Sequence, residues 1–317
     1  MAPAWKRASL AGSEELRGRV SAELHERRAD DAVLKTFPGF SRQEVRQLFE
    51  DGRVRADGKR LKKGERVQRG QELAVDAPSA PIAPDASIPL QVLFESADYV
   101  IADKPAGLPT APLARTQNRS LAAALLARYP ELLGVGFRPR EPGLVHRLDT
   151  ETSGVVLAAR SEEAFRAARA AFESHGFEKR YLAVTLNGVP QAGIIETVLG
   201  PDSADPRRVR AFLEPPEGYS KACVTRYRAL ERGARFTLVE LSVERAFRHQ
   251  IRAHLAHIGF PIAGDALYGG PPAPELLARH ALHGSYIAWA GDARRAGFRA
   301  EAALPAELRA LVGGAAG

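Results

Sequence analysis

The segment that decides the fold spans residues 144–159 and reads LVHRLDTETSGVVLAA. Apolar residues lead into charged ones, a Thr-Ser-Gly turn follows, and an apolar strand candidate begins at Val155. A carboxylate beside the end of a strand lies where a rigid scaffold meets a cleft, which suits a positioned nucleophile or base. Asp149 lies at such a position, shortly before the strand candidate. A carboxylate that only caps its own turn through Thr152 or Ser153 would give the same pattern.

Further strand candidates lie on both sides of this segment. They are short runs of β-branched and aromatic residues bounded by turn residues. The candidates cover residues 91–96, 99–104, 143–148, 154–159, 179–186, 222–230 and 235–243, the last two joined as a hairpin through residues 231–234. One helix is predicted over residues 161–176, with Ser161 as its N-cap. Because few strands alternate with helices, residues 89–317 are expected to form one α+β domain with a mixed, largely antiparallel sheet.

Residues 29–76 predict a smaller unit, preceded by a polar lead-in over residues 1–28. A helix should begin at Ser41, and Asp57-Gly58 between two short runs predicts a tight hairpin. Basic residues crowd this unit, opposed near the hairpin only by Asp57 and Glu65: Arg42, Arg53, Arg55, Lys59, Arg60, Lys62, Lys63, Arg66 and Arg69. Residues 77–88, APSAPIAPDASI, are rich in Pro, Ala and Ser and predict a semi-rigid linker.

Composition narrows the class of protein. The 317 residues carry a formal net charge of +7, which favours a polyanionic partner, although high Arg usage can also follow from the base composition of a genome. Cys223 is the one cysteine of the sequence, so no intramolecular disulfide can form and a reducing, cytoplasmic location is expected. The N-terminal residues lack the apolar run of a signal peptide, and no stretch has the length of a membrane span.

Four motifs show a resemblance to a known family. HRLDTETSG at residues 146–154 matches the signature of the RluA-type pseudouridine synthases, which include enzymes of large-subunit ribosomal RNA. Three more stretches agree in order and spacing: DKPAGLP at 103–109, EKRYLAV at 178–184 and HQIRAHLAHIGFPIAGDALYGG at 249–270. Residues 29–76 resemble the S4 RNA-binding module, in the order that many members of this family show.

The resemblance implies a reaction and its residues. Asp149 would be the essential carboxylate that attacks the target nucleoside, at either C1′ of the ribose or C6 of the base. Tyr181 would stack on the extruded uracil and assist removal of a proton, and Arg252 would pair with Asp149 and keep it ionised. The helix around Arg252 is expected to bury Ile251, Leu255 and Ile258 and to stop at Gly259. No cofactor, metal or nucleotide is implied.

The resemblance also implies contacts with RNA. Arg147 would enter the RNA and help hold the target nucleotide out of its stack, because chemistry on a paired base demands extrusion. His146, Arg248 and His249 are expected beside it, and the basic residues of the S4-like unit would bind phosphates. The sequence departs from the family at two places: Ala246-Phe247 replaces a Gly-Arg pair, and Ala111 stands where relatives often have His.

Other interpretations remain at this point. His249, His254 and His257 could suggest a metal site, but their spacing is not His-Glu-x-x-His and no cysteine lies nearby. An RNA-binding ribosome assembly factor without activity, or a synthase acting on transfer RNA, would share several of these features. The expected protein is a monomer whose partner is RNA, most simply ribosomal RNA.

Overall fold

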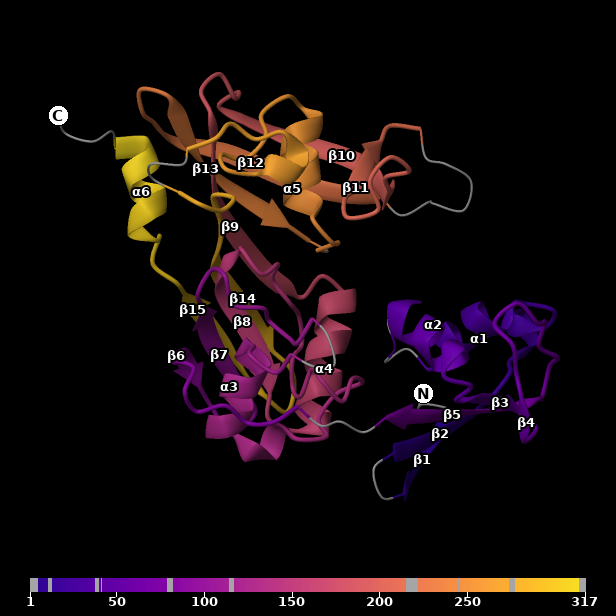
Figure 1. The fold of residues 1–317 in the computed structure, drawn as a ribbon. Coiled ribbons are helices and arrows are strands. Elements are labelled where there is room, and N and C mark those ends of the chain that lie inside the picture. Colours follow the sequence, from indigo (N-terminus) through magenta and orange to yellow (C-terminus); the bar gives the residue numbers. More distant parts are fainter. Residues whose placement is uncertain are drawn as a thin grey trace. The chain divides into compact units, whose positions relative to one another are not determined.

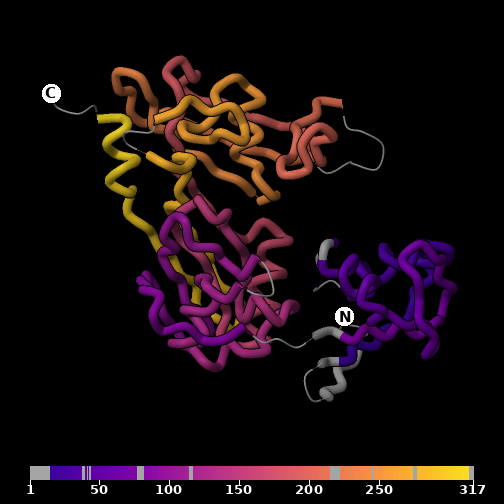
Figure 2. Tube along the Cα trace, in the orientation of Figure 1, coloured from indigo at the N-terminus to yellow at the C-terminus, as the bar shows by residue number. Residues whose placement is uncertain are grey.

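The structure, a computed structural model, describes residues 5–10, 13–37, 40, 42–78, 82–113, 117–214, 222–244, 246–273 and 277–313. These divide into two compact units, one within residues 1–83 and 136–142, the other within residues 84–135 and 143–317. Figure 2 traces the path of the chain through each of them. Within the described ranges, none of the helices has both the length and the apolar character needed to cross a membrane.

The first unit combines an antiparallel sheet with two helices. Its sheet has the order β1-β2-β5-β3-β4. The elements are β1 (Trp5–Leu10), β2 (Ser13–Arg19), the 3-10 turn η1 (Ala22–Leu24), α1 (Ala29–Thr36), α2 (Arg42–Glu50), β3 (Val54–Ala56), β4 (Lys59–Arg60) and β5 (Glu72–Pro78) (Figure 1). Asp57 and Gly58 have φ values of +48° and +77°, as a tight hairpin between β3 and β4 requires. The predicted N-cap Ser41 lies outside the described residues, but the helix that follows it is present.

The boundaries predicted for this unit differ from the observed ones. The polar lead-in contributes β1 and β2, and β2 pairs with β5 so that Leu16 lies opposite Val75. Leu16, Val20 and Leu24 are buried, but charged residues between them conceal the apolar pattern. The predicted linker also begins too early, because residues 77–78 complete β5. At its other end, the backbone N–H of Asp85 donates to the carbonyl of Ala123 in the second unit.

The second unit is built on one ten-stranded sheet. The strands follow the order β11-β10-β12-β13-β9-β14-β8-β7-β6, with β15 also paired to β14. Only β14 and β8 run parallel among the pairs of this sheet that the structure describes. The strands are β6 (Gln91–Glu95), β7 (Tyr99–Lys104), β8 (Ser153–Ala159), β9 (Phe177–Leu186), β10 (Ala192–Pro201), β11 (Val209–Phe212), β12 (Ala222–Arg232), β13 (Phe236–Val243), β14 (Leu282–Gly291) and β15 (Ala296–Glu301). The predicted α+β domain with a mixed, largely antiparallel sheet is confirmed.

Helices cover this sheet in two groups. Figure 1 shows α3 (Leu121–Arg128) and α4 (Glu162–Glu173) with the half that contains β6, β7 and β8, and α5 (Gln250–His257) and α6 (Ala306–Gly313) with the half that contains β10 to β13. Ser161 caps α4 as predicted, its Oγ accepting from the N–H of Ala164 at 3.1 Å. Short 3-10 turns, η2 (Pro130–Leu132) and η3 (Ala266–Tyr268), complete the unit.

Glycine makes the junction of β8 and β14 possible. Gly154 has φ of +116°, and a Cβ atom there would lie 2.1 Å from the carbonyl oxygen of Gly284. Only a residue without a side chain allows the two backbones to approach this closely. The junction fixes the end of the HRLDTETSG segment against the centre of the sheet.

One strand prediction is wrong, and four of the observed strands were not predicted. Residues 143–148 do not form a strand; Leu144 makes an isolated bridge to Ala158, and the N–H of Val145 donates to the carbonyl of Leu157 on β8. The strands β10, β11, β14 and β15 were not predicted. β14 carries Gly284 and Ser285 among its apolar residues, which weakened the pattern expected of a buried strand.

Candidate active site

Asp149 lies in the turn that precedes β8, with its side chain 30% exposed. Arg252, on α5, donates from Nη1 to Oδ2 of Asp149 at 3.0 Å. The remaining edge of the same guanidinium faces Asp265: Nε donates to Oδ2 at 2.7 Å and Nη2 to Oδ1 at 2.8 Å. Among the described residues, no hydrogen bond reaches Oδ1 of Asp149. The arrangement therefore holds one carboxylate oxygen, Oδ2, and leaves Oδ1 without a hydrogen-bond partner among the described residues.

Asp265 was missed by sequence reasoning. Its side chain is 1% exposed and takes the bidentate edge of Arg252, the geometry in which a guanidinium is most firmly oriented. Burial lowers the pKa of Arg252, but the hydrogen bonds and charges of Asp265 and Asp149 outweigh it, so the pKa is raised above its ordinary value. Arg252 is therefore a permanent cation beside Asp149. The GDALYGG motif contained the signal, an acidic residue in a motif shared with the family.

Tyr181 approaches the same place from β9. Leu148 and Tyr181 both lie about 3.6 Å from the position of a Cβ atom on Gly284, so the absence of a side chain there leaves room for both. Burial, and then the negative charge of Asp149, raise the pKa of Tyr181 to about 12. At neutral pH the side chain is a protonated phenol. The structure thus brings Asp149, Tyr181 and Arg252 together, as the sequence predicted.

His249 is a fourth group at this carboxylate. It has φ of +54° at the N-cap of α5, and its Nε2 lies 3.7 Å from Oδ2 of Asp149. Its Nδ1 lies 3.1 Å from the hydroxyl of Tyr268. Burial lowers the pKa of His249, although the charge of Asp149 opposes this. The ring therefore points into the site rather than outward toward a phosphate.

The DKPAGLP loop and Thr110, which follows it, hold the backbone on both sides of Asp149. The Nζ of Lys104 donates to the carbonyls of Pro105, Leu108 and Thr150 at 2.8–3.0 Å. The hydroxyl of Thr110 donates to the carbonyl of Leu148 and accepts its N–H. Burial lowers the pKa of Lys104 to about 7, with Glu151 and Asp149 opposing the shift. The loop thus anchors the residues immediately before and after the carboxylate.

The hydroxyls that follow Asp149 have other partners than its carboxylate. Thr152 Oγ1 lies 2.7 Å from Nε2 of His280, and Ser153 Oγ lies 2.9 Å from Nδ1 of His283. The interpretation in which Asp149 only caps its own turn through these side chains is therefore wrong. Both hydroxyls tie the turn to the segment that leads into β14 and to β14 itself.

The predicted RNA-contacting residues of this unit separate into two groups. Arg147 and Arg248 are exposed, and Arg248 donates to the carbonyl of Arg207. His146 points inward: its Nε2 accepts the N–H of Leu157 at 3.1 Å, and its ring lies 5.5 Å from that of Phe172. Burial lowers the pKa of His146 to about 3, so the ring is neutral at physiological pH. The prediction that His146 binds RNA is not supported by this placement.

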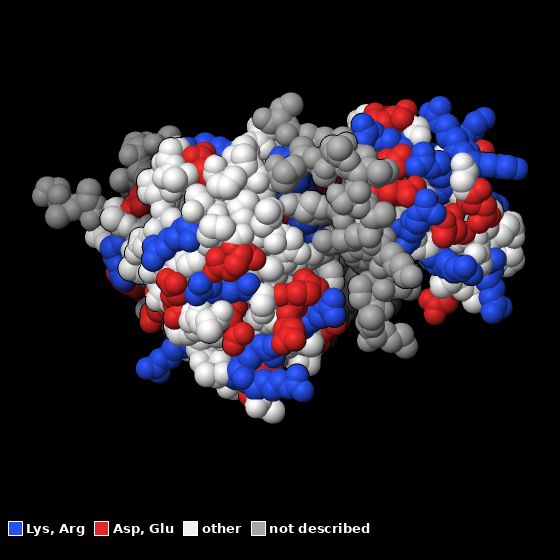
Figure 3. Space-filling view, turned by 90° about the horizontal axis from the view of Figure 1, so that it is seen from below, with Lys and Arg blue, Asp and Glu red and all other residues white. Residues whose placement is uncertain are grey.

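The basic residues of the first unit are mostly exposed. Arg42, Lys59, Arg60, Lys62 and Lys63 lie at the surface. Arg55 differs, because its Nη2 pairs with Glu15 at 3.1 Å and with Asp76 at 2.8 Å, and Arg53 lies 3.6 Å from Asp51. Figure 3 shows Lys and Arg side chains projecting from this unit with acidic groups between them. The surface available to a polyanion is thus centred on the hairpin of β3 and β4.

The structure also places the other residues of α5 and its N-terminal side that the sequence singled out. His254 places its ring between Thr197 and Thr225, with both nitrogens within hydrogen-bond distance of a hydroxyl, so it has a packing role in the core. Ile251 and Leu255 are buried and Ile258 packs beside them, as predicted. At the departure from the family, the N–H of Phe247 donates to the side chain of Gln250, which stabilises the start of α5.

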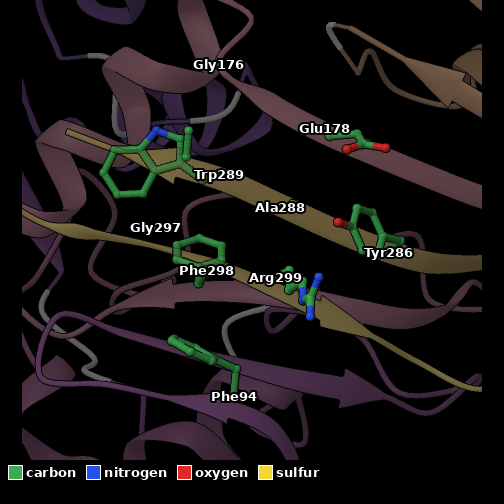
Figure 4. Close-up of a pocket in the computed structure, with 10 residues that line it drawn as sticks. Phe94, Gly176, Glu178, Tyr286, Ala288, Trp289, Gly297, Phe298 and Arg299 are labelled. Carbon is green, nitrogen blue, oxygen red and sulfur yellow. The ribbon is translucent and has the colours of Figure 1, made fainter.

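A separate groove lies on the sheet near β14 and β15, with a cavity volume of about 690 Å³. Figure 4 shows Phe94, Glu178, Tyr286, Trp289 and Arg299 around it. Alternate residues of a strand face opposite sides, so Glu178 on β9 points away from the face that carries Tyr181. The groove does not include Asp149.

Comparisons with known proteins agree with this geometry. The family model of RNA pseudouridylate synthase matches residues 98–257, and that of the S4 domain matches residues 27–73. Ribosomal large subunit pseudouridine synthase D of Yersinia pestis is 31% identical to this chain and covers 96% of it and 95% of its own length. The protein of the same name from Pseudomonas aeruginosa is also 31% identical, with 91% and 92% covered.

Among solved structures, human RNA Pseudouridylate Synthase Domain Containing 1 has a TM-score of 0.55 and 24% sequence identity, covering 70% of this chain and 85% of its own. This likeness supports the fold. The matched residues 98–257 include Asp149, Tyr181 and Arg252. The chain therefore belongs to the RluA-type family of RNA pseudouridine synthases and carries an S4 domain ahead of its catalytic domain.

Proposed function

We propose that this enzyme isomerises specific uridines of large-subunit ribosomal RNA, with Asp149 as the nucleophile. The observation that carries the proposal is the forked contact of Arg252, which holds Oδ2 of Asp149 and leaves Oδ1 without a partner among the described residues. The target RNA is inferred from relatives that are named for the large ribosomal subunit and match nearly the whole chain.

The reaction breaks the C1′–N1 bond of uridine and forms a C1′–C5 bond to the same base. The proton on C5 is lost and N1 gains one, so no oxidant or reductant is consumed. A carboxylate nucleophile can hold the sugar or the base between these steps. Attack on C1′ of the ribose and attack on C6 of the base are both compatible with an open Oδ1. The reaction as proposed needs no metal or nucleotide.

The surrounding residues take separate roles in this proposal. Arg252 orients Asp149 and keeps it ionised. Tyr181 stacks on the extruded uracil, and its phenol, with a pKa of about 12, is a hydrogen-bond donor at neutral pH. Arg147, exposed two residues before Asp149, holds the nucleotide out of its stack. The basic hairpin of the S4 domain binds phosphates of structured RNA. We also propose that the enzyme acts as a cytoplasmic monomer.

Replacing Asp149 by asparagine tests the nucleophile. Asp149→Asn keeps the shape of the side chain and removes its charge, so turnover should fall by at least about 10³-fold while RNA affinity is retained. The matched control is Asp31→Asn, which removes a carboxylate that pairs with Lys35 on α1 and lies in the other unit. Substantial turnover by pure Asp149→Asn would overturn the assignment.

Mapping pseudouridines in cells tests the target. Cells that lack the gene should lose the modification at specific positions of large-subunit ribosomal RNA. The wild-type gene should restore it and Asp149→Asn should not. Loss confined to transfer RNA would overturn the proposed substrate. The other outcome is that cells without the gene keep every modification, and that the wild-type gene and Asp149→Asn rescue their growth or assembly defects equally. This outcome would identify an assembly factor instead.

A further inference from the structure

Tyr268 joins two distant segments to the active site. Its hydroxyl oxygen accepts the backbone N–H of Val209, on β11, at 2.9 Å. Nδ1 of His249 lies 3.1 Å from the same oxygen, and Nε2 of His249 lies 3.7 Å from Oδ2 of Asp149. A line of polar groups therefore runs from β11 through Tyr268 and His249 to the carboxylate. The nucleophile's other donor, Arg252, approaches the same oxygen.

The hydrogen bond from Val209 determines which way the Tyr268 hydroxyl proton points and which nitrogen of His249 is protonated. A phenol oxygen that accepts an N–H still has one proton to donate. If that proton goes to Nδ1 of His249, the neutral imidazole carries its own proton on Nε2, which faces Asp149. The opposite tautomer would make the Tyr268 oxygen accept twice and would leave its proton without an acceptor among the described residues. Complete pairing favours the Nε2–H form.

We propose that Tyr268 fixes His249 as the neutral tautomer protonated on Nε2, which makes His249 a second hydrogen-bond donor to the nucleophilic carboxylate. This inference rests on the proposed role of Asp149. At 3.7 Å the contact is longer than a hydrogen bond in the free protein. Such contacts commonly tighten when a substrate is bound. Tyr268 and His249 are positioning residues, because they act through Asp149.

A neutral donor suits this position. The charged groups that face His249 are Asp149, Arg252, Arg248 and Asp265. Two of them are cations, and Arg252 already neutralises the carboxylate. A second cation in contact with Asp149 would stabilise the ionised ground state of the carboxylate further and make it less nucleophilic. A neutral N–H orients the carboxylate oxygen and lowers its nucleophilicity less.

The backbone of His249 supports a positioning role. Its φ of +54° is an uncommon value for a residue other than glycine, and such conformations persist only where the surrounding contacts hold them. Here α5 begins at the next residue, and Ala253 donates its N–H to the carbonyl of His249. From this left-handed position the ring reaches Asp149, with Nε2 3.7 Å from its Oδ2.

The tautomer can be measured without RNA or turnover. In protein labelled with ¹⁵N-histidine, nitrogen chemical shifts distinguish Nδ1–H, Nε2–H and doubly protonated rings. His249→Gln identifies the signals of His249 among the eight histidines. At neutral pH the wild type should show Nε2–H. Tyr268→Phe, which keeps the ring beside Arg252 and removes only the hydroxyl, should shift the signals toward a mixture of tautomers.

A matched control distinguishes the effect of Tyr268→Phe on the His249 signals from the effect of removing a tyrosine hydroxyl elsewhere in the protein. Tyr286→Phe makes the same change on β14, in the groove of Figure 4, and should leave the His249 signals unchanged. A wild-type ring protonated on Nδ1, or doubly protonated at neutral pH, would overturn the proposal. This outcome is independent of whether Asp149 is the nucleophile.

Single-turnover kinetics at saturating RNA measure the consequence. His249→Met removes the donor at similar length and should lower the rate constant by about 10- to 100-fold, the effect of one hydrogen bond to a charged group. His249→Gln keeps an N–H donor at a comparable distance and should recover most of the rate. The rate constant of Tyr268→Phe should lie between those of His249→Met and His249→Gln.

RNA affinity distinguishes positioning from direct contact with RNA. All three variants should bind RNA with unchanged affinity. Equal rates for His249→Met and His249→Gln, or a loss of affinity that accounts for the lower rate, would overturn the positioning role. If Asp149→Asn retained turnover, the proposed function would fail while the tautomer result would stand on its own.

Discussion

At the scale of single residues, the active site depends on one guanidinium that serves two carboxylates. Arg252 gives its bidentate edge to buried Asp265 and a single N–H to partly exposed Asp149. The buried partner holds the guanidinium through two hydrogen bonds, and the guanidinium in turn holds Oδ2 of Asp149, the proposed nucleophile. A point charge without this fork could neutralise Asp149 but could not orient it through a fixed partner.

Arg252→Lys tests the fork. Lysine retains the positive charge, but its ammonium cannot contact Asp265 through two donors and reach Asp149 at the same time. The rate constant at saturating RNA should fall by about 10²–10³-fold, as for removal of one preorganised donor, with RNA affinity little changed. Arg228→Lys is the matched control, because Arg228 is an exposed arginine of β12 that pairs with one carboxylate, Glu240 on β13. Wild-type turnover by Arg252→Lys would show that charge alone is sufficient.

At the scale of elements, the hairpin of β3 and β4 is the clearest candidate for phosphate binding. Asp57 and Gly58 make its turn, and Lys59, Lys62 and Lys63 are exposed along and after β4. Arg55 contributes less, because Glu15 and Asp76 already neutralise it. The S4 domain should therefore bind RNA through a few exposed cations rather than through its whole positive charge.

Neutralising these cations should weaken RNA binding and its dependence on salt. In the triple variant Lys59→Gln, Lys62→Gln and Lys63→Gln, the slope of log affinity against log salt should become less negative by about 0.7–0.9 for each phosphate that the variant no longer binds. The matched control replaces three exposed, ion-paired arginines of the catalytic domain by glutamine: Arg128, Arg166 and Arg228. An unchanged slope in the lysine variant would mean that the hairpin is only a solvated surface.

At the scale of the whole molecule, buried histidines link stability to pH. Burial lowers the pKa of His254 and of His280 to about 4, and that of His146 to about 3. In the unfolded chain these rings titrate near the ordinary value of 6.5. Between these values the unfolded state binds more protons than the folded state. Stability contributed by neutral rings is therefore complete above about pH 6.5 and declines as the pH falls toward about 4.

Chemical denaturation at several pH values measures this linkage. Each fully buried ring should contribute at most about 1.4 kcal/mol per pH unit to the slope of the unfolding free energy between pH 6.5 and 4. His254→Gln should reduce the slope by about one such increment. His175→Asn is the control, because His175 is exposed and its positive φ is tolerated by asparagine. An unchanged slope in His254→Gln would contradict neutral burial of this ring.

The sequence by itself determined the family and much of the local structure. HRLDTETSG, EKRYLAV and HQIRAHL predicted Asp149, Tyr181 and Arg252 as site residues, and the structure brings the three side chains together. Local signals also predicted the α4 cap at Ser161 and the hairpin at Asp57-Gly58. These features depend on residues close together in the chain, where capping, turn geometry and periodicity act directly.

Only the tertiary structure decided which groups surround the carboxylate. Asp149 and Arg252 are 103 residues apart, and no local pattern specifies that Asp265 takes the other edge of the guanidinium or that Tyr268 meets His249. His146 points inward, where its Nε2 accepts the N–H of Leu157 on β8, and the position of that N–H depends on how β8 packs. Contacts between distant segments depend on how the whole sheet closes, so their partners follow from packing and hydrogen-bond pairing rather than from spacing.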